Sequence, residues 1–152
     1  MSLLHYHAHT EAPREVVWDV LADHAGMSRW MSRVWRSRLL RRGDDAPNGL
    51  GAIRAVITLA GPVHERIVAF EPPQHLEYRM EPEHPLVRDY RGAVELTRMD
   101  SRGTDIHWTV SFRARRSWLE PVIRPLVRLN TKRFASDLSR ASAERAARTS
   151  AR

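Results

Sequence analysis

The chain has 152 residues, no cysteine and 42% hydrophobic residues. These values exclude a disulfide-stapled miniprotein, thiolate catalysis and Cys-ligated zinc, and they predict one domain with a sizeable core. The formal net charge is +7, but residues 1–112 hold 14 basic and 15 acidic groups, whereas residues 113–152 hold 11 and 3. Because the excess lies at one end, the charge does not favour a nucleic-acid-binding body.

No apolar run is long enough to span a bilayer, and the first residues lack the basic and apolar regions of a secretory signal. We therefore expect a cytoplasmic protein.

The N-terminal part predicts one strand followed by two helices. Apolar and polar residues alternate over residues 4–9, which is typical of a strand. Pro13 suits the first turn of a helix over residues 12–22, whose apolar residues share one face. A second short helix is expected over residues 24–30.

Six strand signals follow, separated by short turns and by Gly and Pro breaks. They cover residues 34–40, 52–59, 63–70, 75–80, 87–98 and 104–113. Consecutive strands with short turns predict an antiparallel sheet. In the last strand one face is apolar, formed by Ile106, Trp108, Val110 and Phe112. One side of the sheet is therefore expected to be covered by another apolar element.

The C-terminal segment predicts the helix that covers the sheet. Ser117 and Glu120 have the spacing of a capping box. Pro125 lies deeper, and we expect it to kink the helix or divide its start into two pieces. At about 100° per residue, one stripe is formed by Leu119, Ile123, Leu126, Phe134 and Ala141. We assign residues 3–142 to one domain and expect residues 143–152 to be a frayed basic tail.

Two polar residues interrupt the apolar stripe of this helix. Asn130 lies at its centre, where a buried amide needs a partner. It either caps a local backbone group or faces a ligand or water in a cavity. Asp137 lies about two turns further on, and we interpret it as a solvated or Arg-paired carboxylate.

Glu65 is a candidate general acid or base, provided that it faces the covered side of the sheet. On one register it points inward with Val63, Ile67 and Ala69. On the other register Arg66 and its neighbours point inward, and Glu65 forms an ion pair at the rim. The pattern leaves both registers open.

Three aromatic residues point inward by alternation: Tyr78, Tyr90 and Trp108. Each is either core or part of a ligand-binding wall, and the two hydroxyls need partners.

Two other patterns receive structural interpretations. His5, His7 and His9 alternate with apolar residues, so we place them on the solvent face and expect no metal site. Residues 29–42 hold six Arg with Trp30 and Trp35 interleaved, which we interpret as a solvated strand edge rather than a nucleic-acid site.

The order of elements and several phrases resemble the START/Bet v 1-like (SRPBCC) superfamily, and within it the polyketide cyclase/dehydrase-like group. The phrases lie at residues 12–23, 30, 49–51, 65–73, 90–92 and 103–108. The resemblance covers about residues 3–142. It implies an α+β helix-grip fold, in which a curved antiparallel sheet of about seven strands wraps a long C-terminal helix and leaves a cavity. Members bind lipids, sterols, hormones, polyketides or quinones, and a minority are cyclases or aromatases.

Three functional hypotheses follow. The leading one is a carrier or sensor of a hydrophobic or aromatic small molecule, such as a lipid, polyketide or quinone. Its ligand-binding residues would be Glu65, Tyr78, Tyr90, Trp108, Phe112, Ile123, Asn130 and Phe134.

The second hypothesis is an aromatase-like cyclase/dehydratase without metal or nucleotide cofactor, with Glu65, Tyr78 and Tyr90 as candidate catalytic residues. The third is a lipid or quinone helper that docks on an anionic membrane through its basic C-terminal end. That hypothesis predicts loss of vesicle binding when residues 140–152 are removed. We expect no nucleic-acid partner, and a monomer or homodimer.

Overall fold

The computed structural model describes residues 1–100 and 102–152. The strands are β1 (Ser2–Thr10), β2 (Val34–Arg41), β3 (Ile53–Thr58), β4 (Gly61–Glu71), β5 (His75–Met80), β6 (Val87–Arg98) and β7 (Thr104–Ala114). The helices are α1 (Arg14–Leu21), α2 (Met27–Trp30) and α3 (Glu120–Ser150), with 3-10 turns η1 (His24–Gly26) and η2 (Ser117–Leu119). Every predicted element is present, and the boundaries lie within about two residues of those expected from the sequence, except that α3 ends later than expected.

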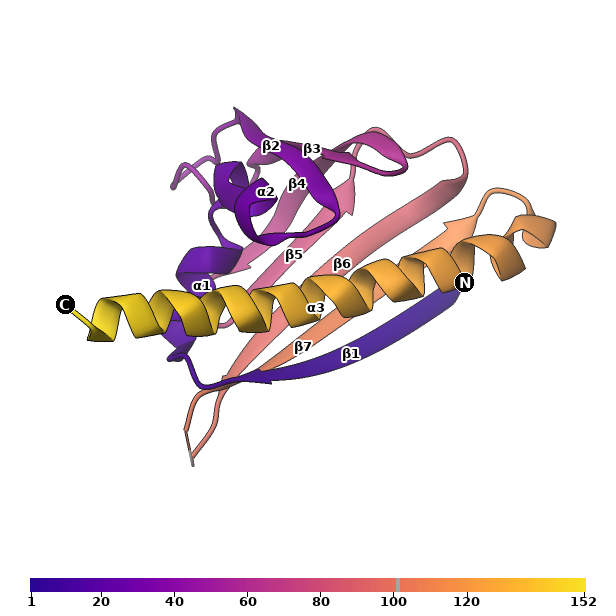
Figure 1. Ribbon diagram of the computed structural model, residues 1–152. Helices are drawn as coiled ribbons and strands as arrows, with labels where there is room; N and C mark the ends of the chain where they lie inside the picture. The colour runs from indigo at the N-terminus through magenta and orange to yellow at the C-terminus, as the bar shows by residue number, and fades with distance from the viewer. Residues whose placement is uncertain (101) are drawn as a thin grey trace.

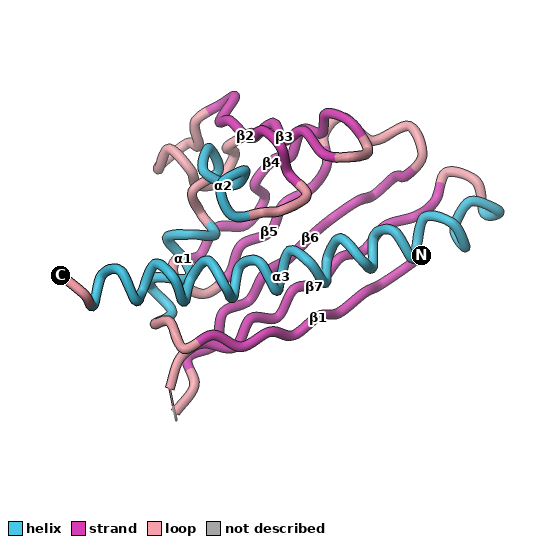
Figure 2. Tube along the Cα trace, in the orientation of Figure 1, coloured by secondary structure: helices cyan, strands magenta, loops and turns pink. Residues whose placement is uncertain are grey.

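The seven strands form one antiparallel sheet in the order β1-β7-β6-β5-β4-β3-β2. The sheet curves behind α3, which crosses it from one end to the other (Figure 1). A tube along the chain shows the same arrangement, with α1 at the C-terminal half of α3 and α2 near β2, β3 and β4 (Figure 2). This is the helix-grip fold.

Burial follows the period of two along the strands. In β7 the four residues of the predicted apolar face are at most 2% exposed, while the three residues between them are half-buried. Because successive side chains of a strand point to opposite faces, this alternation assigns the inner face to the core with α3. Helix α1 packs against α3 and β6 and closes one end of that core.

The start of α3 differs from the expectation in two ways. Leu119 is the N-cap residue and no side chain of residues 1–100 and 102–152 caps the helix, so the predicted capping box is wrong. The Glu120 carboxylate instead accepts a hydrogen bond from the Ser2 hydroxyl of β1. Pro125 lies inside the helix and does not divide it. The irregularity lies earlier, in the η2 turn.

The buried face of α3 is rotated from the predicted stripe. Ile123 and Ala141 are buried as expected, but Leu126 is 59% exposed. Small and medium side chains fill the face toward the sheet: Ile123, Thr131, Ala135, Leu138, Ala141 and Ser142. The helix continues to Ser150, so residues 143–150, which we expected to fray, are helical. Within the described residues, no helix is long and apolar enough to cross a membrane.

Candidate functional site

A cavity of about 200 Å³ lies between the sheet and the N-terminal half of α3. Pockets for drug-sized ligands usually measure about 300–1,000 Å³. The cavity therefore fits a small ring system, or one end of a longer molecule that leaves through the mouth. Residues of α2, six strands (β2 to β7) and α3 line it, and most of them are apolar.

The polar floor of the cavity is a buried ion pair between neighbouring strands. Arg54 of β3 lies opposite Glu65 of β4 in the antiparallel register. Arg54 Nε donates to Glu65 Oε1 at 3.0 Å, and the two side chains are only 3% and 11% exposed. The inward register of Glu65 is thus the one that occurs, and its partner is an arginine that the sequence analysis did not single out.

The inward-facing residues of strand β4 follow one of the two predicted registers before a bulge and the other register after it. A bulge between Ile67 and Ala69 shifts the alternation. Before the bulge Glu65 and Ile67 point inward, and beyond it Phe70 packs against Trp18 of α1, with ring centroids 5.1 Å apart. The sequence was ambiguous here because a bulge changes the face of every residue that follows it.

A fully buried histidine holds Arg54 from the other side. His24 Nδ1 is 3.2 Å from Arg54 Nη1, and His24 Nε2 is 2.8 Å from the Asn48 carbonyl oxygen. Since Arg54 can only donate, Nδ1 accepts and the ring proton is on Nε2. Burial, with the nearby Arg54 charge, lowers the pKa of His24 to about 3. His24 is therefore a neutral acceptor that orients the guanidinium.

The guanidinium of Arg54 is fixed on three sides. Besides Glu65 and His24, its Cζ lies 4.7 Å from the centroid of the Tyr78 ring, in cation–π geometry. Nη2 has no acceptor among the residues that the structure describes. Because Arg54 lines the cavity, this nitrogen is a donor available to an oxygen of a bound molecule.

Tyr78 adds a second polar group to the same wall. Its hydroxyl accepts a hydrogen bond from Trp108 Nε1 at 3.0 Å. Burial, and then the Glu65 charge, raises the pKa of Tyr78 above its ordinary value of 10.0, so the hydroxyl keeps its proton. Gly92 of β6 makes room for the ring, since a Cβ at Gly92 would lie 2.2 Å from Tyr78 Cζ.

Most of the sequence-predicted ligand-binding residues lie together in the cavity wall. Seven line it: Glu65, Tyr78, Tyr90, Trp108, Ile123, Asn130 and Phe134. The Trp108 and Phe134 rings lie 6.0 Å apart. Burial, and then Tyr78, raises the pKa of Tyr90 well above 10.0. The exception is Phe112, which is fully buried in the core and does not line the cavity. It lies further along β7 than the cavity reaches. Ligand binding by these residues stays a prediction.

The histidines of β1 lie on the outer face of the sheet, as the alternation indicated. His5 Nδ1 is 3.1 Å from His107 Nε2, and the His7 ring stacks on His107 at 4.3 Å. Burial, with His7 and His5 nearby, lowers the pKa of His107. Among the described residues no group of three or more His, Cys, Asp or Glu side chains could hold a metal.

Two further residues from the sequence analysis have structural roles. Asp137 is buried, accepts hydrogen bonds from the Ser32 amide and hydroxyl at 2.9 and 2.8 Å, and lies 3.4 Å from Arg140. It is thus Arg-paired but not solvated. In the Arg-rich segment, Trp30 is buried and Trp35 is 63% exposed on the edge strand β2.

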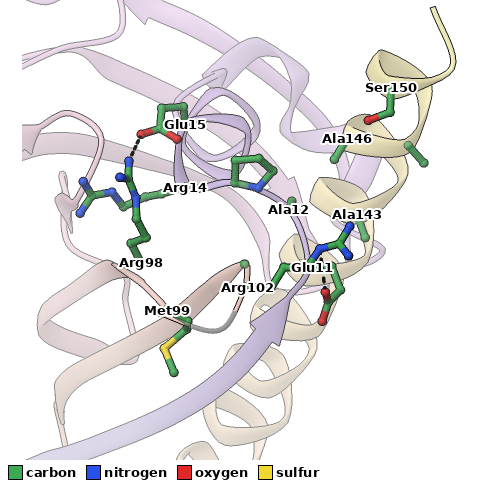
Figure 3. A pocket seen from close by; sticks show the side chains of 13 residues that line it. Glu11, Ala12, Arg14, Glu15, Arg98, Met99, Arg102, Ala143, Ala146 and Ser150 are labelled. Atoms are coloured by element: carbon green, nitrogen blue, oxygen red, sulfur yellow. Dashed lines mark hydrogen bonds and ion pairs between the residues drawn. The ribbon is translucent and has the colours of Figure 1, made fainter.

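A second hollow lies far from this cavity, between the start of α1, the end of β6 and the end of α3 (Figure 3). Its opposite charges pair with one another: Arg98 with Glu15 at 2.8 Å and Arg102 with Glu11 at 3.4 Å. Alanines of α3 form much of its other wall. The cavity, where the buried Arg54 lies among apolar walls, is therefore the candidate functional site.

The pairing of Arg54 with Glu65 is predictable from the sequence through the short turn between their strands. Residues 59 and 60 form a two-residue turn between β3 and β4, with Thr58 opposite Gly61. Counting back from this turn pairs Arg54 with Glu65. His24 carried no such signal, because its burial depends on the residue 43–51 loop closing over it.

Comparison with known proteins agrees with this architecture. The family described as "Polyketide cyclase / dehydrase and lipid transport" matches residues 4–150. The chain belongs to this family, and its helix-grip fold is shared by solved structures that include a START superfamily protein. No curated protein matches the chain.

Several solved structures are similar. The Zhui aromatase/cyclase from Streptomyces sp. R1128 has a TM-score of 0.83 and 16% identity, covering 95% of this chain and 94% of that one. A START superfamily protein from Mycobacterium smegmatis has a TM-score of 0.74 and 10% identity, covering 97% and 98%. The di-domain ARO/CYC StfQ from the steffimycin biosynthetic pathway has a TM-score of 0.77 and 13% identity, covering 95% and 51%. At these identities the likeness shows the fold alone.

Proposed function

We propose that the protein binds a hydrophobic, ring-containing small molecule in the cavity, with one oxygen of that molecule accepting a hydrogen bond from Arg54. The observation that carries this proposal is the guanidinium itself. It is buried, held by Glu65 and His24 and stacked on Tyr78, yet one of its nitrogens has no acceptor among the described residues, and Arg54 lines an apolar cavity. The family to which the chain belongs is described in terms of polyketide cyclases, dehydrases and lipid transport, and this description supports the same class of ligand.

Burial of rings against the apolar walls supplies most of the affinity, at about 25 cal/mol per Å² of apolar surface. The hydrogen bond from a charged donor adds about 1.5–3 kcal/mol, which corresponds to a roughly 10- to 150-fold preference for an oxygen-bearing ring. A carbonyl or phenolate oxygen suits Arg54 because the guanidinium has no acceptor of its own.

The test compares 2-methyl-1,4-naphthoquinone with naphthalene, by calorimetry and by quenching of tryptophan fluorescence. We expect the quinone to bind at least tenfold more tightly, and Arg54→Lys to reduce this preference to a few-fold. Val63→Phe, which fills the cavity, should weaken both probes, whereas Val68→Phe, outside the cavity, should weaken neither. Native mass spectrometry of freshly purified protein would also reveal a co-purifying ligand.

Equal affinities for the two probes would refute the role of Arg54. Absence of saturable binding for either probe, together with no co-purifying ligand, would refute the cavity as a binding site.

A second candidate function, a cyclase or dehydratase, is favoured by two hydrogen-bond donors, Arg54 and Tyr78, that line the same cavity. An oxygen bound between Arg54 and the protonated Tyr78 hydroxyl would be polarised, which acidifies the adjacent carbon. Zhui and StfQ, named as aromatase/cyclase proteins, have the same fold. Glu65 is tied to Arg54 by its Oε1, however, so the geometry supports holding an oxygen better than removing a proton.

This second function is tested by deuterium exchange at the carbon next to the carbonyl of 1-tetralone, followed by NMR. An enzyme should accelerate the exchange, and Glu65→Gln should abolish the acceleration if Glu65 is the base. If bound 1-tetralone exchanges deuterium no faster than 1-tetralone in buffer alone, the protein does not catalyse this step, and binding remains the proposed function.

A further inference from the structure

The η2 turn and the first half of α3 carry a row of exposed apolar side chains, the α3 row. Val122, Leu126 and Leu129 share one side of α3, at spacings of four and three residues, and Trp118 of the η2 turn lies four residues before Val122. In chain order, from Trp118 to Leu129, their exposed fractions are 69%, 61%, 59% and 49%. Soluble proteins usually expose such residues singly, whereas a contiguous row marks an interaction surface.

This row is continuous with the mouth of the cavity. Leu126 also lines the cavity, as do Leu59 of the β3–β4 turn and Leu86 of the loop before β6. Leu59 is 75% exposed and Leu86 is 47% exposed, so these three leucines form the rim. Six of the twelve strongly exposed large apolar side chains of the described residues thus lie in the α3 row or at the cavity rim.

The charged side chains around this surface are mostly basic, and several of them form no ion pair within the part of the chain that the structure describes. Arg116, Lys132 and Arg133 of the α3 region form no ion pair with any described residue. The acidic groups nearby are already engaged: Glu83 pairs with Arg115 at 2.8 Å, and Glu120 accepts from the Ser2 hydroxyl.

We propose that this apolar row and rim, with Arg116, Lys132 and Arg133, dock on an anionic lipid bilayer. A helix with an exposed apolar face flanked by basic residues lies in the interface of such a bilayer. The row stands on a convex helix rather than in a groove, so it suits insertion among lipid chains better than reception of a protein segment. Docking there would place the cavity mouth against the bilayer, and this inference does not depend on which molecule the cavity holds.

The surface is distinct from the basic C-terminal end that the sequence suggested. At 1.5 Å per residue, Arg148 lies about 33 Å along α3 from Leu126. The neighbours of Arg148 in the last turns are mostly alanines and exposed polar residues, with no large apolar side chain to insert.

The test is co-sedimentation with vesicles of phosphatidylcholine alone and with 30% phosphatidylglycerol. We expect binding to the anionic vesicles at low salt. Lys132→Gln/Arg133→Gln should weaken it on the order of 25-fold, since each basic residue at the surface contributes about fivefold. Trp118→Ser/Leu126→Ser should weaken it at least tenfold. Two matched controls should keep full binding: Trp35→Ser, at an equally exposed tryptophan elsewhere, and Arg145→Gln/Arg148→Gln in the tail. Circular dichroism of each variant confirms that it is folded.

Three outcomes would overturn the proposal. If folded wild-type protein does not bind the anionic vesicles, the bilayer is not the partner, and an acidic protein becomes the alternative. Binding that is lost in the tail variant but kept in the α3 variants would assign docking to the C-terminal end. A dimer by light scattering that Trp118→Ser/Leu126→Ser converts to a monomer, without vesicle binding, would make a second copy the occupant.

Discussion

The ion pair between Arg54 and Glu65 predicts an unusual pattern of stabilities. Their nitrogen and oxygen are 3.0 Å apart, which corresponds to about 5 kcal/mol of attraction at an effective dielectric constant of 20. Burial of both charges offsets much of this attraction, so the intact pair contributes little net stability. Removing one partner leaves the other charge buried alone, which usually costs about 3–5 kcal/mol.

We expect Glu65→Leu to lower the free energy of unfolding by about 3–4 kcal/mol. Arg54→Met should cost at least as much, because it also removes the hydrogen bond to His24 and the contact with Tyr78. The double variant, which removes both charges, should lie within about 2 kcal/mol of the wild type. In a domain of this size each kcal/mol shifts Tm by about 2–4 °C, so each single variant should melt about 10 °C lower.

Urea denaturation of the four proteins gives the coupling free energy of this double-mutant cycle. We expect a coupling of at least 2 kcal/mol. Arg66→Gln/Glu81→Gln, at a half-buried ion pair with the same 3.0 Å separation and greater access to water, is the matched control and should show less than about 1 kcal/mol. Additive effects at Arg54 and Glu65, with a coupling as small as that of the control, would refute the buried-pair reasoning.

Three other predictions concern the groups around this pair. His24 has a pKa lowered to about 3 against an ordinary value of 6.5, so below pH 6.5 the unfolded chain binds a proton that the native state does not. Stability should therefore fall by up to about 1.4 kcal/mol per pH unit between pH 6.5 and 3. Urea midpoints should show a shallower fall for His24→Gln, and equal slopes would contradict the assignment. Tyr78→Phe leaves Trp108 Nε1 without its acceptor and should cost about 1–3 kcal/mol in urea. Tyr90→Phe is the control, and an equal loss there would contradict the role of the Trp108 hydrogen bond. Gly92→Ala should lower Tm by several degrees and weaken naphthoquinone binding, because its Cβ displaces the Tyr78 ring; an unchanged affinity would show that the ring position does not matter.

The predicted strands agree with the structure because burial of one sheet face imposes a strict period of two. The apolar face of β7 and the inward placement of Tyr78 and Trp108 follow directly from that period. Helix α3 was harder to predict, since a helix rotates by about 100° per residue and a small change in orientation moves Leu126 from the core to the surface.

The polar part of the site depends on relations between elements. Glu65 was ambiguous because the bulge near Ala69 gives its strand two alternations. His24 comes from a short turn near the start of the chain, and only the closure of the 43–51 loop brings Asn48 onto its ring.

The sequence by itself determined the order of elements, the inner face of each regular strand and the separation of charge between body and C-terminal end, because these follow from local periodicity and composition. The tertiary structure decided which polar groups meet. It paired Arg54 with Glu65, oriented the guanidinium with His24, and left a row of apolar side chains exposed beside the cavity mouth. These contacts join segments that are distant in the chain, and their geometry depends on sheet register and on the rotation of α3.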